Sequence, residues 1–286
     1  AQRACPGIQL VRASVLFPAP FAALRQRFCE GGDDMFIRSL WQSSPWDSGR
    51  GGKSGSTFLK TFDGRYLLKQ VPKSEFSSFH EHARAYFAFV SNTPTTLPSV
   101  LVKVMGAFMV EYRERDANNA WTSSRVQYLL VQENLFYGMN VSRMCDLKGA
   151  HRNRGPNPNG EDDNDTVLDE NLFRFNDGYP LLLTEVAKQQ LTRALWNDTL
   201  FLQSINVMDY SLLVGMVQQP RDPTDVSSVG EQWTLVVGLI DYCRQYAWKE
   251  EVESRVKRGT VIQPKQYKRR FREALHRYFM SSIEKY

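Results

Sequence analysis

Two aspartates stand at the edges of apolar runs, in an arrangement suited to phosphoryl transfer. Asp209 interrupts the run 207–215, and Asp241 ends the run 235–240. Phosphoryl transfer needs one carboxylate beside the attacking hydroxyl and another to hold the metal that bridges the nucleotide phosphates. The residues between the two aspartates indicate a strand, a polar loop over 218–232 and a second strand. Such a pair of strands would place Asp209 and Asp241 side by side.

A lysine lies inside an apolar strand nearer the N-terminus. Lys69 falls within Tyr66-Leu67-Leu68-Lys69-Gln70, where a charged group is costly unless an anion pairs with it. Phosphate oxygens could be that anion, and Glu75 of the following helix is the nearest carboxylate that could assist. The alternative is a lysine on the solvent face of a half-buried strand.

A glycine-rich segment, 49–56, precedes this strand pair. Small residues let backbone N–H groups approach phosphate oxygens. A P-loop would need glycine at position 47, where Asp47 stands, and a helix after it, whereas 57–61 is typical of a strand. A flap between two strands over a nucleotide fits the order better, and an ordinary glycine-rich hairpin is the alternative.

Composition favours a folded globule. The chain has 286 residues, 42% of them hydrophobic and 12% aromatic, enough for one large domain or two lobes. No apolar run approaches the roughly twenty residues of a membrane span, and the first residues do not have the pattern of a secretory signal. We expect the chain to be part of a longer protein. The four cysteines are far apart and form no Cys-x-x-Cys, which is typical of a reduced, intracellular protein and gives no sign of zinc.

Periodicity predicts strands mainly in the first half of the chain and helices mainly in the second. Helical spacing of apolar residues appears at 74–90, and it recurs at 184–205 and 266–278. The predicted strands are 11–17, 57–61, 65–71, 100–111, 126–132 and the two that flank the loop 218–232. Because the two kinds of element are segregated, α+β fits better than a doubly wound sheet.

Positive charge is concentrated near the C-terminus. Residues 249–277 carry ten Lys and Arg against four Glu, a local balance of +6 in a chain of net charge +5. Such a segment suggests contact with an anionic membrane, a phosphorylated ligand or nucleic acid, and a solvated helix face is the alternative. No nucleic-acid recognition motif accompanies it, so nucleic acid is not an expected partner.

Several motifs occur together in a fixed order and carry a family resemblance. They are Phe36-Ile37-Arg38-Ser39-Leu40, Gly51-Gly52-Lys53-Ser54-Gly55, Leu68-Lys69-Gln70, Glu133-Asn134-Leu135-Phe136-Tyr137, Asp146-Leu147-Lys148-Gly149, Arg152-Asn153-Arg154, Met208-Asp209-Tyr210-Ser211-Leu212-Leu213 and Ile240-Asp241-Tyr242. From about Val11 to the C-terminus, the chain resembles the catalytic domain of phosphatidylinositol phosphate kinases. It most resembles the type III branch, the PIKfyve-like phosphatidylinositol 3-phosphate 5-kinases.

The resemblance implies a two-lobed fold, distantly similar to protein kinases and ATP-grasp enzymes, with an N-terminal lobe at 1–139 and a C-terminal lobe at 140–286. It implies ATP and Mg²⁺ as cofactors, Asp209 as the catalytic aspartate and Asp241 as the metal ligand. Lys69 and Lys148 would supply positive charge to the phosphates. The residues it places at the nucleotide are Gly51, Gly52, Lys53, Ser54, Gly55, Lys69, Glu133, Lys148 and Asp241.

The site cannot be an ordinary protein-kinase catalytic loop. In protein kinases an Asn five residues after the catalytic Asp holds a second metal, whereas Val214 occupies that position here. Charge neutralisation must therefore come from elsewhere, and Lys69 and Lys148 are the obvious suppliers.

The resemblance also implies that the basic segment after Asp241 selects the phosphoinositide and touches the membrane. Glu250 and Glu251 lie in a charged stretch in or beside which the type III branch usually has a Lys. Carboxylates that face an anionic head group would be repelled, so these two side chains would have to point away from it, or the lipid specificity would differ. Arg152 and Arg154 could bind substrate phosphate or pair with acidic loop residues. The full set of expected substrate contacts is Arg152, Arg154, Arg255, Lys257 and Arg258.

The implied reaction is transfer of phosphate from ATP to the 5-hydroxyl of phosphatidylinositol 3-phosphate. Phosphatidylinositol 4-phosphate is the alternative substrate, and a catalytically silent phosphoinositide-binding module is the alternative from another class. The implied location is peripheral, on the cytoplasmic face of endosomal or vacuolar membranes, within a protein that has further domains.

Overall fold

The computed structural model describes residues 8–46, 57–114, 125–149, 167–169, 172–173, 176–218, 233–246 and 262–281. Several predicted features lie outside the described residues. They are the glycine-rich segment with Gly51, Gly52, Lys53, Ser54 and Gly55, the substrate contacts Arg152, Arg154, Arg255, Lys257 and Arg258, Glu250 and Glu251, and the loop 219–232.

The chain divides into two compact units. Unit 1 comprises Ala1–Asp47, Ser54–Ser77 and Lys103–Asn134, and unit 2 comprises Ser48–Lys53, Ser78–Val102 and Leu135–Tyr286. The predicted lobes 1–139 and 140–286 stay a prediction.

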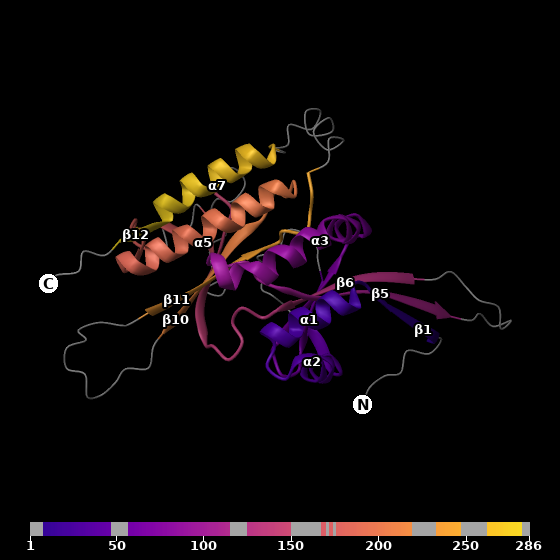
Figure 1. Ribbon diagram of the computed structural model, residues 1–286. Helices are drawn as coiled ribbons and strands as arrows, with labels where there is room; N and C mark the ends of the chain where they lie inside the picture. The colour runs from indigo at the N-terminus through magenta and orange to yellow at the C-terminus, as the bar shows by residue number, and fades with distance from the viewer. Residues whose placement is uncertain are drawn as a thin grey trace. The chain divides into compact units, whose positions relative to one another are not determined.

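Unit 1 is built on a six-stranded antiparallel sheet of order β1-β5-β6-β4-β3-β2. Its strands are β1 (Ile8–Val15), β2 (Ser43–Trp46), β3 (Phe58–Thr61), β4 (Tyr66–Val71), β5 (Val104–Glu114) and β6 (Arg125–Glu133). Helices α1 (Pro18–Phe28) and α2 (Gly32–Leu40) also belong to this unit and lie next to one another (Figure 1).

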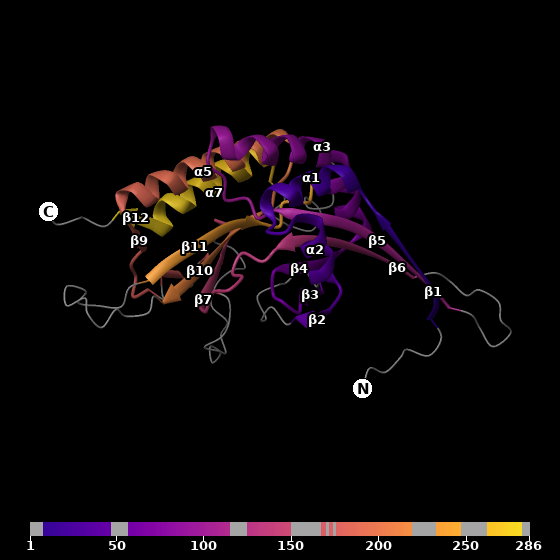
Figure 2. The ribbon, with the colours of Figure 1, turned by 60° about the horizontal axis from the view of Figure 1, so that its bottom comes forward.

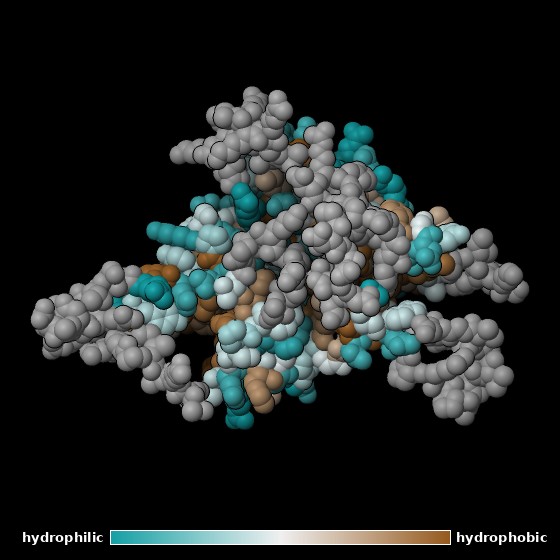
Figure 3. Space-filling view, turned by 180° about the vertical axis from the view of Figure 1, so that it is seen from behind, coloured by the Kyte–Doolittle hydropathy of each residue, from teal (hydrophilic) through white to brown (hydrophobic). Residues whose placement is uncertain are grey.

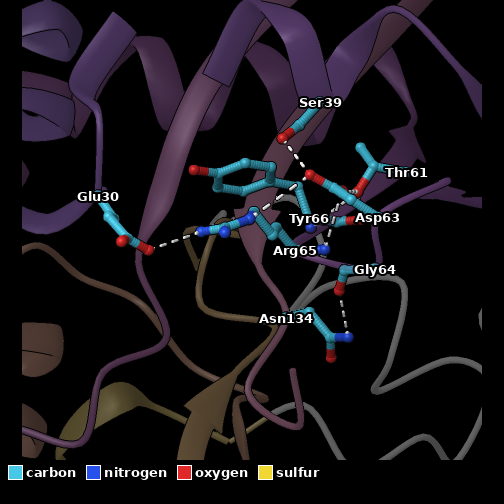
Figure 4. Close-up of polar contacts among 8 residues, drawn as sticks. All are labelled: Glu30, Ser39, Thr61, Asp63, Gly64, Arg65, Tyr66 and Asn134. Atoms are coloured by element: carbon cyan, nitrogen blue, oxygen red, sulfur yellow. Dashed lines mark hydrogen bonds and ion pairs between the residues drawn. The ribbon is translucent and has the colours of Figure 1, made fainter. Parts of the chain in front are cut away.

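The turn between β3 and β4 ties three elements of unit 1 together (Figure 4). The Asp63 carboxylate accepts hydrogen bonds from Ser39 of α2, at 2.5 Å, and from Thr61, at 2.7 Å. Burial alone would raise the pKa of Asp63, but these hydrogen bonds and the nearby Arg65 outweigh it, so the pKa lies below its ordinary value. Asn134 donates to the carbonyl of Gly64 at 2.7 Å. The turn thus secures residues of two of the motifs, at α2 and just after β6.

Unit 2 contains a four-stranded sheet of order β11-β10-β7-β8 and a parallel strand pair, β12-β9. Its strands are β7 (Val141–Leu147), β8 (Val167–Leu168), β9 (Leu181–Leu183), β10 (Ser211–Gln218), β11 (Trp233–Ile240) and β12 (Phe279–Ser281). Helices α5 (Glu185–Ser204) and α7 (Pro264–Tyr278) lie side by side over the β7-β10-β11 sheet (Figure 2). Helix α3 (Lys73–Thr96) begins in unit 1 and continues in unit 2.

The four-stranded sheet has one buried face and one partly open face. Leu147, Leu212 and Leu239 are neighbours in register and are each 0% exposed. Side chains alternate along a strand, so Leu213 and Ile240 belong to the opposite face, where both are only half-buried. The functional side chains of the sheet therefore lie on the face or at the strand ends that the core leaves open.

The mixture of sheets and helices confirms the predicted α+β class. The predicted strands at 57–61 and 65–71 are present, as are the strands on either side of 219–232 and the three helices. Two predicted strands have different bounds: β5 starts at Val104 rather than at residue 100, and the first strand is Ile8–Val15 rather than 11–17. Residues 100–102 instead run beside β11, where the Val102 N–H donates to the Leu239 carbonyl at 3.0 Å.

Candidate active site

Strand pairing brings the two aspartates to the same end of β10 and β11. Ser211 pairs with Ile240 as the last rung of the ladder, and Asp209 and Asp241 lie just beyond it. An isolated bridge between Val207 and Gln245 closes the other side. Both aspartates are therefore enclosed between two backbone pairings, which confirms that the strand, loop and strand arrangement brings them together.

Both aspartates have an unusual backbone conformation. The φ angle is 64° at Asp209 and 61° at Asp241, in the left-handed region that few residues other than glycine adopt. Asp tolerates this region better than most residues, but the conformation is kept only where the surroundings enforce it. Non-glycine residues with such backbones concentrate at functional sites, and here two of them lie at the same end of one strand pair.

Lys148 contacts Asp209 directly. Its ammonium lies 3.1 Å from Oδ1 of Asp209 and 2.8 Å from the Asp209 carbonyl oxygen. The Lys148 side chain is 17% exposed and that of Asp209 is 51% exposed, so the pair is open on the carboxylate side. This lysine–aspartate pair joins the Asp146-Leu147-Lys148-Gly149 motif to the Met208-Asp209-Tyr210 motif.

A buried carboxylate, Asp169, holds the backbone that carries Lys148. Oδ1 of Asp169 accepts from the N–H of Lys148 at 2.9 Å and from the N–H of Gly149 at 2.6 Å. Asp169 is 2% exposed, and the hydroxyl of Tyr278 donates to the same oxygen at 2.8 Å. Sequence analysis missed Asp169, because an isolated acidic residue after a two-residue strand carries no signal of its partners.

Helix α7 packs against Tyr210, the residue that follows Asp209 and precedes β10. Tyr267 donates its hydroxyl to the Tyr210 carbonyl, next to Asp209, and the ring of Tyr210 packs edge-on against Tyr267 and Phe271. Burial, followed by the negative charge of Asp209, raises the pKa of Tyr267 well above its ordinary value, so its hydroxyl stays protonated as a donor. Tyr267 and Phe271, which are part of the helical spacing at 266–278, are therefore also contacts between this helix and the site.

Lys69 forms an ion pair within unit 1. Its ammonium lies 3.2 Å from Oε1 of Glu75, and the two side chains are 7% and 16% exposed. Glu75 lies in the first turn of α3, so the predicted partner is confirmed. A lysine on a strand paired with a glutamate on the next helix is also the arrangement that protein kinases use to orient their phosphate-binding lysine.

Glu133, at the end of β6, has a partner within unit 1. Its Oε1 accepts from the backbone N–H of Lys103 at 2.7 Å and lies 3.1 Å from the Lys103 ammonium. These contacts give the carboxylate a role in joining β6 to the residues before β5. A contact between Glu133 and a nucleotide stays a prediction.

The donor set at Asp241 suits Mg²⁺. The half-buried carboxylate of Asp241 is a hard oxygen ligand at the open end of the sheet. Mg²⁺ is usually held by one or two carboxylates together with substrate phosphates and water, rather than by a cage of protein ligands. Within the described part of the chain no group of three His, Cys, Asp or Glu side chains is placed to hold a metal.

The unit 2 site therefore combines an exposed carboxylate, an ammonium that contacts it and a second carboxylate at the same end of the sheet. A carboxylate can orient or accept the proton of a hydroxyl, and an ammonium can offset charge on phosphate oxygens. The arrangement fits a phosphotransferase.

Comparison with known proteins agrees with this class. Residues 42–228 match the family described as Phosphatidylinositol-4-phosphate 5-Kinase, and the chain belongs to that family. Use of ATP follows from membership of this kinase family.

The chain is also similar to curated relatives from plants, yeast and mammals. It is 39% identical over 272 residues to the 1-phosphatidylinositol-3-phosphate 5-kinase FAB1B of Arabidopsis thaliana, and the matched region is 91% of this chain and 14% of that protein. It is 35% identical over 287 residues to the 1-phosphatidylinositol 3-phosphate 5-kinase FAB1 of Saccharomyces cerevisiae, with 96% and 12% covered. For the Homo sapiens 1-phosphatidylinositol 3-phosphate 5-kinase the identity is 37% over 277 residues, with 92% and 12% covered. The chain thus spans only about a seventh or less of the length of these three relatives.

Proposed function

We propose that this chain is the kinase domain of an enzyme that phosphorylates the inositol 5-hydroxyl of phosphatidylinositol 3-phosphate, giving phosphatidylinositol 3,5-bisphosphate. The observation that carries the proposal is the contact between Lys148 and Asp209, with Asp241 at the same end of the sheet. The names of the similar proteins, each a 3-phosphate 5-kinase, support the choice of lipid.

In this proposal Asp209 accepts or orients the proton of the lipid 5-hydroxyl. Its carboxylate is half exposed and can reach a substrate, while its backbone is held between two pairings. The hydroxyl oxygen forms a bond to the γ-phosphorus of ATP, and the bond from that phosphorus to the β–γ bridging oxygen breaks to release ADP. The Lys148 ammonium orients the Asp209 carboxylate and offsets negative charge on the transferred phosphoryl group.

Lys69 has a second charge-offsetting role in the proposal. Glu75 restrains its ammonium, as the strand lysine is restrained in protein kinases. Lys69 then contacts the nucleotide phosphates together with backbone groups of Gly51–Gly55, and Glu133 contributes to the same nucleotide site.

Asp241 would hold Mg²⁺. A bound Mg²⁺ supplies positive charge that neutralises phosphate oxygens of the nucleotide. Asp241 is suited to this because the Ser211–Ile240 pairing beside it fixes its backbone, which has a φ of 61°. The protein's own contribution is the position of that carboxylate relative to Asp209.

The proposal includes peripheral binding to an anionic membrane, where the lipid substrate resides. The exposed side chains of Lys265 and Arg269 on α7 and the half-buried Lys268 continue the basic segment that starts at residue 249. Arg152, Arg154, Arg255, Lys257 and Arg258 are the proposed contacts with the substrate phosphate. By resemblance to the relatives, the membrane would be endosomal or vacuolar.

Phosphatidylinositol 4-phosphate is the second candidate substrate. The family that matches the chain is described by that lipid, and Glu250 and Glu251 lie in the segment expected to select the head group. Carboxylates near the phosphate of the head group would change which lipid binds better without altering the chemistry at Asp209.

The test is an assay of the purified chain with labelled ATP and vesicles that contain one monophosphorylated phosphatidylinositol at a time. We expect transfer to the 3-phosphate lipid and a product phosphorylated at positions 3 and 5. The 5-phosphate lipid is the matched control, because its 5-hydroxyl is already blocked. Faster transfer to the 4-phosphate lipid would favour the second candidate, and ATP binding by calorimetry without turnover on any lipid would favour the silent binding module.

A further inference from the structure

A hydrogen-bond chain that is buried at Tyr278 and Asp169 connects the C-terminal helix to the lysine–aspartate pair. It runs from the Tyr278 hydroxyl to Asp169, from Asp169 to the backbone of Lys148 and Gly149, and from the Lys148 ammonium to Asp209. We propose that Asp169 and Tyr278 are positioning residues that hold the Lys148 ammonium on Asp209. This inference rests on the proposed function, because it concerns how that reaction's lysine is placed.

Asp169 is built to fix a backbone rather than to meet a substrate. It is 2% exposed, and its carboxylate accepts from two successive backbone N–H groups and from a tyrosine hydroxyl. Buried carboxylates are costly unless such donors satisfy them, and hydrogen bonds to a charged acceptor are stronger than neutral ones. Together these contacts hold the end of β7 at Lys148 in one conformation.

The backbone at this point is also held by packing against α7. Lys148 is the first residue after β7, and Gly149 beside it has a φ of 69°. A Cβ at Gly149 would lie 2.9 Å from Cβ of Ala274 and 3.2 Å from Cα of Phe271, so the backbone rests directly on α7. Close packing on α7 and the backbone hydrogen bonds that Asp169 accepts therefore fix the backbone from which the Lys148 side chain extends.

Tyr278 couples this anchor to helix α7. Its side chain is 1% exposed, and its hydroxyl lies 2.8 Å from Oδ1 of Asp169. The same helix donates a second tyrosine hydroxyl, from Tyr267, to the carbonyl next to Asp209. One helix thus restrains the backbones of both members of the pair, and a small shift of the ammonium would remove it from the charge it must offset.

The experiment replaces Tyr278 with Phe, which removes the hydroxyl and keeps the ring. We expect kcat for the lipid substrate to fall about tenfold or more while KM for ATP and lipid stays near its original value. Hydrogen–deuterium exchange of the Lys148 and Gly149 amides should become faster, since their acceptor is loosened.

Thr199→Val is the matched control. Thr199 is also fully buried and also bonds α7, because its hydroxyl accepts from Nε of Arg272 at 2.8 Å. It lies on α5, however, where the same hydroxyl donates to the Leu195 carbonyl at 2.6 Å. This variant should lose stability without a change in kcat or in exchange at Lys148 and Gly149. It separates a general loosening of α7 from the positioning effect.

Three outcomes decide the inference. A lower kcat with faster exchange at Lys148 and Gly149, absent from Thr199→Val, supports it. Unchanged kcat in Tyr278→Phe, or equal losses in both variants, would overturn it. If the unaltered chain transfers no phosphate to any lipid, the proposed function fails instead, and unchanged exchange in Tyr278→Phe would then refute the anchor independently of activity.

Discussion

At the scale of single residues, the site depends on charges held in constrained places. Asp209 and Asp241 have left-handed backbones, and Lys148 bonds both the carboxylate and the carbonyl of Asp209. Two strained residues at the end of one strand pair cost free energy, on the order of 1–3 kcal/mol each. Because the surrounding pairings enforce these conformations, the backbones that carry the two carboxylates are fixed before substrate binds.

Replacing Asp241 with Asn should abolish turnover and leave the fold intact. Asn has nearly the same shape and tolerates a φ of 61°, but it is a much weaker magnesium ligand than a carboxylate. We expect kcat to fall at least about 100-fold with little change in melting temperature. Full activity in this variant would refute the metal assignment.

Asp177→Asn provides the control. Asp177 also has a positive φ, 51°, but it is exposed in the turn before β9. This variant should keep both activity and melting temperature, so a loss confined to Asp241→Asn cannot be attributed to the backbone conformation.

Sequence alone predicted the residues whose partners are near in the chain or belong to a motif. The Lys69–Glu75 ion pair spans six residues and follows from a strand with a helix after it. Asp169 was missed because its partners, Lys148, Gly149 and Tyr278, are 20 to 109 residues away. Long-range pairing of a buried polar group leaves no local periodicity to detect.

At the scale of elements, helix α7 supports the site through close packing. Gly149 lies against Phe271 and Ala274, and the rings of Tyr267 and Phe271 stack at 6.2 Å. The apolar spacing of α7 was visible in the sequence, but the element it packs against was not.

Gly149→Ala should destabilise the chain and lower its activity. The added Cβ would approach Ala274 at 2.9 Å and the Phe271 backbone at 3.2 Å, and alanine is disfavoured at a φ of 69°. We expect a loss of about 2–4 kcal/mol, as strain and overpacking add. Gly138→Ala is the control, because Gly138 has a φ of 73° but, apart from its chain neighbours, no atom of the described residues lies within 4 Å of the added Cβ, so it should lose only about 1 kcal/mol. Equal losses, measured by urea titration, would contradict the packing argument.

Helix α3 carries a buried histidine that should make stability depend on pH. His82 is 4% exposed, and burial lowers its pKa from 6.5 to about 4, although a backbone contact with Ser78 opposes this. Between these two values the unfolded chain binds a proton that the folded chain does not, so stability falls as the pH falls. The expected loss from this group is about 2 kcal/mol between pH 7 and pH 5.

The measurement is urea unfolding at both pH values. His82→Leu should lose this part of the dependence, whereas His80→Gln, a change at an exposed position of the same helix, should keep it. An unchanged pH dependence in His82→Leu would show that other groups are responsible.

Elements with regular patterns were the ones that sequence analysis predicted. Alternating or helical apolar spacing marked β3, β4, β10, β11, α3, α5 and α7. Strand β7 was missed because Ser142, Arg143 and Asp146 interrupt its apolar positions, and α2 because nine residues give little periodicity. The two-residue strand β8 pairs with β7, and the short strands β9 and β12 pair with each other. These strands form through long-range pairing, which local sequence patterns do not reveal.

At the scale of the whole molecule, charge and surface composition bear on membrane binding. Within the described parts of the chain, no helix combines the length and the hydrophobicity needed to cross a bilayer. On the face shown in Figure 3, hydrophilic and apolar residues are interspersed. On α7, burial and then the charges of Arg272 and Lys265 lower the pKa of Lys268, which marks a local concentration of positive charge.

Binding to anionic vesicles should weaken as salt is added, because the attraction is electrostatic. The double variant Lys265→Ser/Lys268→Ser should bind roughly 30-fold more weakly, at about 1 kcal/mol for each lost charge. Arg84→Ser, at an exposed position on α3, is the control and should bind as the unaltered chain does. Binding that is independent of salt would count against this role of the basic surface.

The central claim is that Asp209, with Lys148 against it, performs phosphoryl transfer to a phosphoinositide. The most direct measurement compares transfer from labelled ATP to phosphatidylinositol 3-phosphate vesicles by the unaltered chain and by Asp209→Asn. Asn can adopt the φ of 64° and keeps the carbonyl that Lys148 contacts at 2.8 Å, so the fold should persist. We predict that the melting temperature is retained while kcat falls at least about 100-fold. Undiminished transfer by Asp209→Asn would contradict the account.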